Sequence, residues 1–240
     1  MADRFYCAEP LGPGEVHLVG AEAHHLAHVR RFAPGDEVVL FNGDGKEYPA
    51  TIVAISKRSV VLSVRAVETP QREVERPVVV AAAVPKADRA DFLVEKLTEL
   101  GVHRFIPLLT ARSTVHPKES SVERYRRGVI EASKQCGRNR FMTVDGVHSW
   151  PALLARNDLP PARLVLHTRP GLPILQPQTP AVVAVGPEGG FTSEELAAAE
   201  AAGWRLVSLG ARTLRLETAA VAAAAILTLP AAQSTGSAPQ

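Results

Sequence analysis

The chain of 240 residues has little of what marks membrane, secreted or metal-binding proteins. No run of eighteen uncharged apolar residues occurs, which argues against a transmembrane helix. The start, Met-Ala-Asp-Arg-Phe-Tyr, has no basic region followed by an apolar stretch, so we expect no secretory signal. The only cysteines, Cys7 and Cys136, lie in no metal-ligand or redox motif. We therefore predict a cytoplasmic protein with reduced thiols and no bound metal.

The charge of the chain is small overall but unevenly distributed. The net charge is +2, and residues 1–72 carry eight Lys and Arg against nine Asp and Glu. Residues 112–140 carry eight Lys and Arg against three acidic residues. Such a concentrated basic stretch is typical of a surface that contacts phosphates, although a solvated helix face gives the same pattern.

The first seventy residues have the pattern of a small β-rich unit. The sequence Asn42-Gly43-Asp44-Gly45 separates two apolar stretches, and Asn-Gly and Asp-Gly pairs suit the positive φ of a hairpin turn. A polar segment bracketed by prolines, residues 68–77, indicates a domain boundary, which we place after residue 72. The elements expected before it are a helix over Glu22–Arg31 and strands over Glu37–Phe41, Glu47–Ile55 and Ser59–Val64.

From residue 73 the pattern changes to an alternation of strands and helices. The run Pro77–Val84 is continuously apolar, as expected for a strand buried on both faces of a parallel sheet. We predict an α/β domain over residues 73–232, with a disordered tail over 233–240. Its further strands are expected at 104–109, 163–167, 181–185 and 205–209, and its helices at 90–100, 120–136, 194–202 and 219–229.

A glycine-containing turn follows the predicted strand 181–185. Gly186-Pro187-Glu188-Gly189-Gly190 leads into a helix whose start, Thr192 to Glu195, has the spacing of a capping box. Glycines at the carboxyl end of a buried strand let a ligand approach the backbone closely. Glu188 would repel a phosphate, so the turn favours a cationic or neutral ligand. A tight turn without any ligand is the alternative.

A second turn, Leu209 to Thr218, precedes an almost wholly apolar helix. Arg215 and Glu217 stand at the mouth of that helix, where charged residues must be paired or face a site. One interpretation is an ion pair between them with Thr218 as the N-cap. The other is that both side chains line a crevice.

The two turns together resemble a known family. The pair Gly-Pro-Glu-Gly-Gly and Leu-Gly-x-Arg-x-Leu-Arg-x-Glu-Thr-Ala is similar to the ribosomal RNA small subunit methyltransferase E family, SPOUT-class enzymes that methylate uridine N3 in 16S rRNA. Residues 95–102, 135–140 and 166–169 agree, as do the N-terminal His24–Arg31 and Pro34-Gly35. The resemblance implies a PUA-like RNA-binding β-barrel domain followed by a knotted methyltransferase domain, a homodimer, and S-adenosylmethionine as the cofactor.

The resemblance implies which residues bind the cofactor, and the chemistry of methyl transfer to RNA suggests the catalytic and RNA-contacting residues as hypotheses. The catalytic candidates are Arg215 and Arg138, which could stabilise charge on the uracil oxygens, and Glu217, a possible proton acceptor. The residues expected to bind the cofactor are His167, Thr168, Gly186, Glu188, Gly189, Gly190, Leu209, Gly210, Leu214 and Arg215. Those expected to contact RNA are Arg30, Arg31, Arg124, Arg127, Arg138 and Arg140.

Three alternatives stay open at this point. The chain could be a SPOUT methyltransferase for another base or another RNA. It could also be an RNA-binding factor that kept the fold and lost the cofactor. Separately, His24 and His28 stand four residues apart, a spacing found in metal sites, but no acidic residue or cysteine accompanies them, so an RNA-facing helix is the better interpretation.

Overall fold

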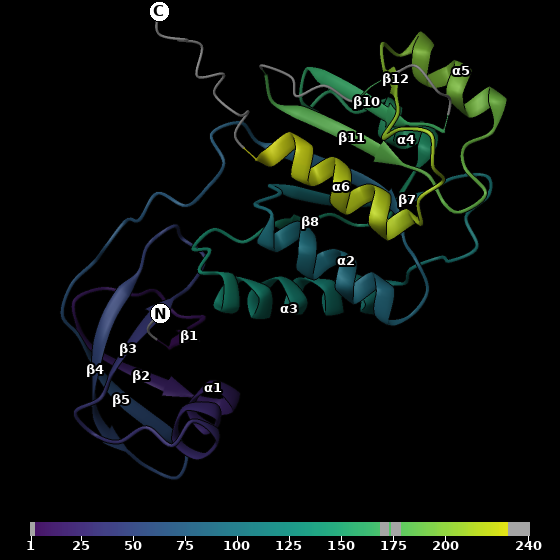
Figure 1. Ribbon diagram of the computed structural model, residues 1–240. Coiled ribbons are helices and arrows are strands. Elements are labelled where there is room, and N and C mark those ends of the chain that lie inside the picture. Colours follow the sequence, from purple (N-terminus) through teal and green to yellow (C-terminus); the bar gives the residue numbers. More distant parts are fainter. Residues whose placement is uncertain (1–2, 169–172, 174–178, 230–240) are drawn as a thin grey trace, which may run out of the picture. The chain divides into compact units, whose positions relative to one another are not determined.

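The computed structural model describes residues 3–168, 173 and 179–229, which fall into two units (Figure 1). Unit 1 comprises the chain up to Glu73 together with Arg127–Phe141, and unit 2 comprises Val74–Arg126 and the chain from Met142 onward. The division after Glu73 lies one residue from the expected boundary. Residues 127–141 group with unit 1, whereas the sequence places them in the second domain. The tail predicted over 233–240 lies outside the described residues.

Unit 1 is built on a five-stranded sheet with the strand order β1-β3-β4-β5-β2. All neighbours pair antiparallel except β1, which runs parallel to β3. Inward side chains from all five strands converge on one hydrophobic core. The three predicted strands are confirmed, and the sequence analysis missed β1 and β2. The bounds are β1 Arg4–Tyr6, β2 Gly14–Val19, β3 Glu37–Phe41, β4 Tyr48–Ile55 and β5 Ser59–Val64.

The predicted hairpin between β3 and β4 is confirmed. Gly43 and Gly45 in its turn have φ values of 92° and 96°, which L side chains rarely adopt. The Tyr48 hydroxyl donates a hydrogen bond of 2.5 Å to the Asp44 carboxylate. Burial and this bond raise the pKa of Tyr48 to about 12, so the phenol stays protonated and keeps the turn attached to the strand.

The predicted helix over residues 22–31 begins and ends two residues earlier and changes its winding. It consists of α1 (Gly20–His24) followed by a π-helical turn, η1 (His25–Val29). Arg31, just after it, has a φ of 57°. A π-turn widens the helix by one residue per turn, and such turns often accompany functional sites.

Unit 1 contains a buried ionic cluster around the Glu47 carboxylate. Glu47 is 6% exposed, and its carboxylate accepts hydrogen bonds from the guanidinium groups of Arg4 and Arg72. Burial opposes ionisation, but the hydrogen bonds and charges of Arg72 and Arg4 outweigh it and hold the pKa of Glu47 below its usual range. The carboxylate therefore stays charged inside the unit.

The segment 127–141 joins the same cluster. Arg4 donates hydrogen bonds of 2.6 Å to the Asn139 side chain and of 3.2 Å to the Arg138 carbonyl. Arg72 donates to the Gly137 carbonyl at 2.9 Å. These contacts hold the end of a long helix and the residues after it against the β-sheet of unit 1.

Unit 2 is built on a seven-stranded sheet in which all recorded pairs are parallel. Its order is β12-β10-β11-β6-β7-β8, with β9 also pairing with β7, which confirms the predicted α/β fold. The two-residue strands β8 and β9 and the short α4 were not predicted. The strands are β6 Val78–Ala83, β7 Arg104–Leu109, β8 Thr143–Val144, β9 His148–Ser149, β10 Ala162–Leu166, β11 Ala181–Val185 and β12 Arg205–Val207.

Helices cover both faces of this sheet. The helix α6 lies across β6 and β11 and packs beside α2 (Figure 1). On the opposite face α4 and α5 enclose a core that includes Trp150, Phe191 and Trp204. None of the described helices is both long and apolar enough to span a membrane. The helices are α2 Asp88–Glu99, α3 Glu119–Cys136, α4 Trp150–Leu154, α5 Ser193–Ala201 and α6 Leu216–Thr228.

We predict that Glu47→Gln destabilises unit 1 by about 3 kcal/mol near neutral pH, because the buried guanidinium of Arg4 and the partly exposed one of Arg72 lose their shared counter-charge. Because the pKa of Glu47 is lowered in the folded state, its stabilisation of unit 1 is fully present above the ordinary glutamate pKa of about 4.3. The stabilisation is lost as the pH falls from that value through the folded-state pKa. The difference from the wild type should therefore shrink on acidification. Amide hydrogen exchange of β4 and β5 against pH measures it.

The matched control is Glu37→Gln, which breaks the exposed pair between Glu37 and Arg65. It should change the stability by less than about 1 kcal/mol. Equal effects of the two substitutions at neutral pH would contradict a structural role for the buried cluster.

Candidate functional site

The candidate site lies at the carboxyl ends of three neighbouring strands, β12, β10 and β11. Leu166 pairs with Val207, and Val165 pairs with Ala184, so the three strands end at nearly the same level. Because the strands are parallel, the segments that follow them meet at one edge of the sheet. Segments about forty residues apart in the sequence are brought together in this way.

A pocket of about 260 Å³ opens between these segments. Its walls combine glycine backbone, aliphatic side chains and a few polar groups, with Glu188 as the only carboxylate among the described lining residues. The lining residues are Arg112, Leu166, His167, Thr168, Val185, Gly186, Pro187, Glu188, Gly189, Gly190, Phe191, Leu209, Gly210, Arg212, Thr213, Leu214, Leu216 and Ala219.

The pocket brings together nine of the ten residues expected to bind the cofactor. They are His167, Thr168, Gly186, Glu188, Gly189, Gly190, Leu209, Gly210 and Leu214. The tenth, Arg215, is exposed and is not one of the lining residues. Arg212 and Thr213 from the same loop line the pocket in its place, and the sequence analysis did not single them out.

The loop Gly186–Gly190 is a tight turn held from both sides. The Gly190 amide donates a hydrogen bond of 2.8 Å to the Pro187 carbonyl, and Gly190 has a φ of 67°. A Cβ atom on Gly186 would lie 3.0 Å from the ring of Phe191. That ring is packed against Trp150, with their centroids 4.6 Å apart, so it has little room to give way. Glycine is therefore required at both positions for this shape.

Arg112, in the loop after β7, supports the same turn and was missed by the sequence analysis. Its guanidinium donates a hydrogen bond of 2.8 Å to the Gly189 carbonyl. A Cβ atom on Gly189 would lie 3.3 Å from the Arg112 side chain. The position of Arg112 just after a predicted strand could have marked it as a residue of the site. Its contact with Gly189 could not be predicted, because Gly189 is 77 residues away.

The predicted capping box at the start of α5 is confirmed, and it also holds a neighbouring loop. Thr192 accepts a hydrogen bond from the Glu195 amide, while the Glu195 carboxylate accepts one from the Thr192 amide at 2.9 Å. The other oxygen of Glu195 accepts a bond of 2.8 Å from the Ala111 amide. One carboxylate thus joins the loop after β7 to the loop after β11.

The start of α6 differs from both interpretations of the sequence. The helix begins at Leu216 with Arg215 as its N-cap, because the Leu216 side chain is buried in the core. Glu217 pairs at 3.4 Å with Arg89 of α2, not with Arg215. Glu217 is 6% exposed and does not line the pocket. Its expected role as proton acceptor stays a prediction.

Arg138 also differs from expectation. It is 5% exposed, and its guanidinium binds the Glu73 carboxylate at 2.6 Å and 3.1 Å. This pairing lies inside unit 1, and the roles expected of Arg138 in catalysis and in RNA contact stay predictions.

The other arginines expected to contact RNA fall into two groups. Arg30 pairs with Asp3, and Arg124 pairs with Asp91 at 3.1 Å, so both are partly neutralised. Arg31, Arg127 and Arg140 are exposed, and no carboxylate is recorded as pairing with them among the described residues.

The histidines His24 and His28 lie with their ring centroids 4.8 Å apart. Within the described part of the chain, no cluster of three or more His, Cys, Asp or Glu side chains could hold a metal ion.

Comparison with known proteins decides the family. A family described as an RNA methyltransferase domain matches residues 72–228, and one described as an RNA methyltransferase PUA domain matches residues 18–65. The chain belongs to this RNA methyltransferase family. The resemblance stated from the sequence is thereby confirmed, together with the PUA-like first domain.

Individual relatives agree over most of the chain. The ribosomal RNA small subunit methyltransferase E of Synechocystis is 34% identical, over 94% of this chain and 77% of its own length. The same-named protein of Mycobacterium bovis is 35% identical, over 91% and 88% respectively. The Neisseria gonorrhoeae enzyme of that name, solved with S-adenosylmethionine, superposes with a TM-score of 0.86 at 31% identity, over 94% of this chain and 96% of that chain. A Legionella pneumophila methyltransferase with bound cofactor gives 0.86 at 30% identity over the same shares.

We predict that Glu195→Ala loosens the pocket wall at a cost of about 1–2 kcal/mol, since the helix loses its cap and the Ala111 amide loses its acceptor. The Ala111 and Thr192 amides should exchange with solvent at least several-fold faster, as measured by hydrogen exchange. Glu200→Ala in the same helix is the control, because Glu200 is exposed and near the helix end. Unchanged exchange at Ala111 in Glu195→Ala would contradict this account.

Proposed function

We propose that this chain transfers a methyl group from S-adenosylmethionine to N3 of a uridine in the 16S rRNA of the small ribosomal subunit. The observation that carries the proposal is the pocket of unit 2, in which the glycine turns after β11 and β12 and the segment after β10 converge. The family and the names of its relatives support the reaction class and the substrate.

The lining residues fit S-adenosylmethionine chemically. When bound, the cofactor supplies an electrophilic methyl group on a positively charged sulfur. Glu188 places one carboxylate in the pocket, which suits this cation, while Arg112 and Arg212 line the pocket as well. The aliphatic side chains of Leu166, Leu209 and Leu214 offer surface for the adenine ring, and the glycines let a ligand approach the backbone closely.

The protein's main contribution is to hold the uracil in line with the methyl group. N3 of uracil lies on the Watson–Crick edge and carries a proton, so the base must be unpaired or turned out of a helix. Loss of that proton leaves charge on O2 and O4, which a nearby cation stabilises. We assign this role to Arg212, which lines the pocket, and to Arg215, which is exposed three residues further on.

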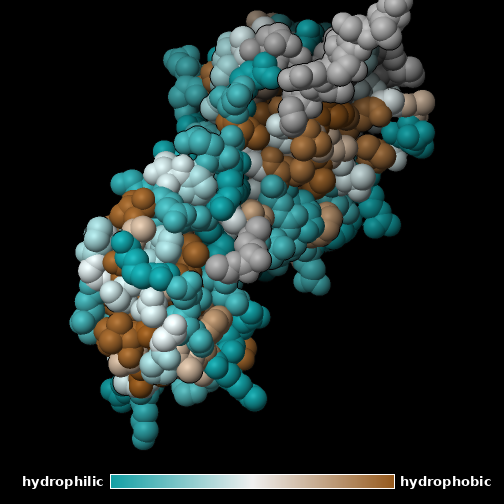
Figure 2. All heavy atoms as spheres, turned by 60° about the vertical axis from the view of Figure 1, so that its left-hand side comes forward, coloured by the Kyte–Doolittle hydropathy of each residue, from teal (hydrophilic) through white to brown (hydrophobic). Residues whose placement is uncertain are grey.

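We propose further that unit 2 contains a trefoil knot, that the chain acts in the cytoplasm, where small subunits are assembled, and that it forms a homodimer. The dimer has support in the surface of unit 2. Phe92 of α2 and Ile226 of α6 are 46% and 39% exposed on two helices that pack beside each other. Figure 2 shows hydrophobic residues gathered over this part of unit 2.

We predict that Ile226→Glu converts the protein to a monomer, because a buried carboxylate without a partner strongly opposes association. Light scattering after size exclusion gives the molecular mass directly. Val53→Glu is the control, since Val53 is an equally apolar, 53% exposed residue of unit 1. A wild-type protein that is monomeric at micromolar concentration would contradict the dimer.

The reaction itself is tested by methyl transfer from labelled S-adenosylmethionine to small ribosomal subunits that lack the modification, with the product nucleoside identified by mass. We expect 3-methyluridine in 16S rRNA. Gly186→Ala should reduce cofactor affinity at least about fivefold, because the added methyl group displaces Phe191 and the pocket wall that it supports.

Gly146→Ala is the matched control, since a Cβ atom at Gly146 meets nothing within 4 Å. It should bind the cofactor and transfer methyl groups as the wild type does. A different methylated nucleoside would place the enzyme on another base, and failure to bind S-adenosylmethionine would exclude the methyltransferase activity.

A further inference from the structure

Unit 1 contains a second hollow, of about 420 Å³, on its own surface. It is lined by Gly20, Ala23, His24, His28, Ser56, Lys57, Arg58 and Ser59. The sheet register explains its position: Val19 at the end of β2 pairs with Ser59 at the start of β5, so α1 starts beside the turn that joins β4 to β5. One wall is thus the α1–η1 helix, and the other is that turn.

The charged groups of the hollow all have the same sign. Lys57 and Arg58 are permanently cationic, His24 and His28 add two imidazoles, and no carboxylate is among the described residues that line the hollow. Within the described residues, neither Lys57 nor Arg58 takes part in a recorded ion pair, unlike Arg30, which pairs with Asp3, or Arg65, which pairs with Glu37. Both cations therefore keep their charge available to a partner.

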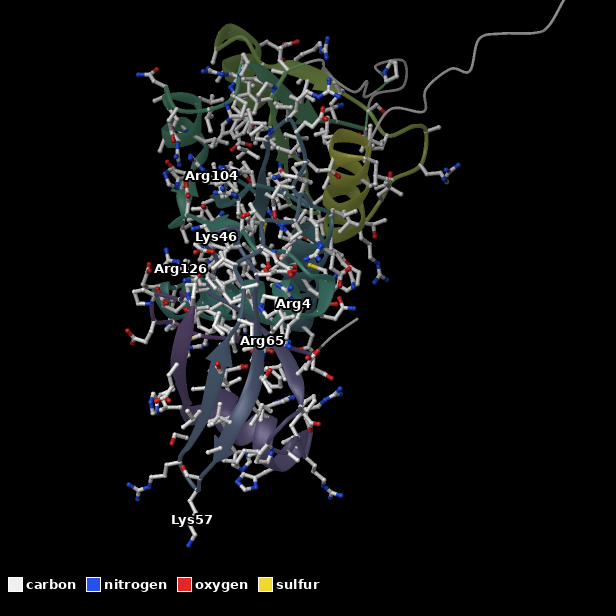
Figure 3. The ribbon with its side chains drawn as sticks, turned by 90° about the vertical axis from the view of Figure 1, so that its left-hand side faces the viewer. Arg4, Lys46, Lys57, Arg65, Arg104 and Arg126 are labelled. Carbon is white, nitrogen blue, oxygen red and sulfur yellow. The ribbon has the colours of Figure 1, made fainter. Side chains whose placement is uncertain are left out.

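The backbone around the hollow is held in place by the turn itself. The Ser56 hydroxyl oxygen accepts hydrogen bonds from the amides of Arg58 and Ser59, and the Ser56 hydroxyl is 3.0 Å from that of Ser59. These hydrogen bonds fix the backbone of the turn without using the side chains of Lys57 and Arg58. Figure 3 shows Lys57 projecting from the tip of the turn, at the opposite end of the strands from Arg65.

These observations select the ligand. A metal cation at His24 and His28 would be repelled by Lys57 and Arg58 on the facing wall. An anion is attracted by Lys57 and Arg58, and ammonium, guanidinium and imidazole groups are suitable donors to phosphate oxygens. An extended, multiply charged phosphodiester chain also matches the span from the helix to the projecting Lys57.

We propose that this hollow binds the phosphodiester backbone of the RNA substrate and thereby orients unit 1 on it. The proposal rests on the proposed function, since it names the part of unit 1 that contacts the same RNA. Backbone contacts carry no base specificity, so the hollow contributes affinity and register, while the pocket of unit 2 selects the reacting base.

The test is binding of the full chain to unmodified 16S rRNA, measured by filter binding between 50 and 250 mM KCl. We expect Lys57→Ala with Arg58→Ala to weaken binding about tenfold at the lowest salt concentration and to reduce the slope of log K against log salt by about 1 to 2. The charge reversal to Glu at both positions should weaken binding further. Calorimetric binding of S-adenosylmethionine should be unchanged in both variants, which also shows that unit 2 is intact.

Arg65→Ala is the matched control, because Arg65 belongs to the same unit but is neutralised by Glu37. It should bind RNA with the wild-type affinity and salt slope. Equal RNA binding by the wild type and the double alanine variant would overturn the proposal while leaving the methyltransferase function intact. A variant that binds free 16S rRNA normally but fails on assembled subunits would also overturn it, because the hollow would then contact a ribosomal protein. Absence of RNA binding by the wild type would instead remove the proposed function itself.

Discussion

The parallel pairing of β12, β10 and β11 is the constraint on which the site of this protein depends. Neighbouring parallel strands have their carboxyl ends at the same edge of the sheet, so the segment that follows each strand starts at that edge. Three segments that are distant in the sequence become the walls of one pocket without any direct bond between them being required. The side chains in those segments could vary widely while the pocket kept its place, so the chemistry is set by the loops and the location by the sheet.

Contacts around the loops after β7 and β11 then give the pocket a fixed shape. Arg112 holds the Gly189 carbonyl, and Glu195 joins the Ala111 and Thr192 amides, so the loop after β7 supports the loop after β11 from outside. Phe191, packed against Trp150, closes the same loop from the core side. A pre-formed pocket reduces the ordering cost of binding, which matters for an enzyme that must align two reactants.

The arginines of the chain have two kinds of role, structural ion pairing and exposure to a ligand, which the sequence alone does not distinguish. Arg4 and Arg138 are buried in ion pairs that, together with the partly exposed Arg72, hold the segment 127–141 in unit 1. Arg58, Arg212 and Arg215 are exposed beside a hollow or a pocket. Burial decides between these uses, because a guanidinium removed from water needs a fixed carboxylate, whereas one that meets RNA must stay free for it.

The sequence by itself determined the features that depend on neighbouring residues. Apolar runs gave the central strands, the Thr192–Glu195 spacing gave the capping box, and the glycines of 186–190 gave the turn that lines the pocket, because each of these follows from local backbone chemistry. The family resemblance predicted the domain order and the cofactor class. It could do so because the motifs that carry it are short, contiguous stretches of sequence.

Only the tertiary structure decided which charged groups meet. The helix α6 begins at Leu216 because that side chain is buried, and this start turns Glu217 toward Arg89 and removes Arg215 from the pocket wall. Arg112 forms a hydrogen bond with Gly189, which is 77 residues away, and the buried Arg138 forms an ion pair with Glu73. Such pairings are selected by packing and by the cost of leaving a buried charge unpaired, and both depend on residues that lie far apart in the sequence.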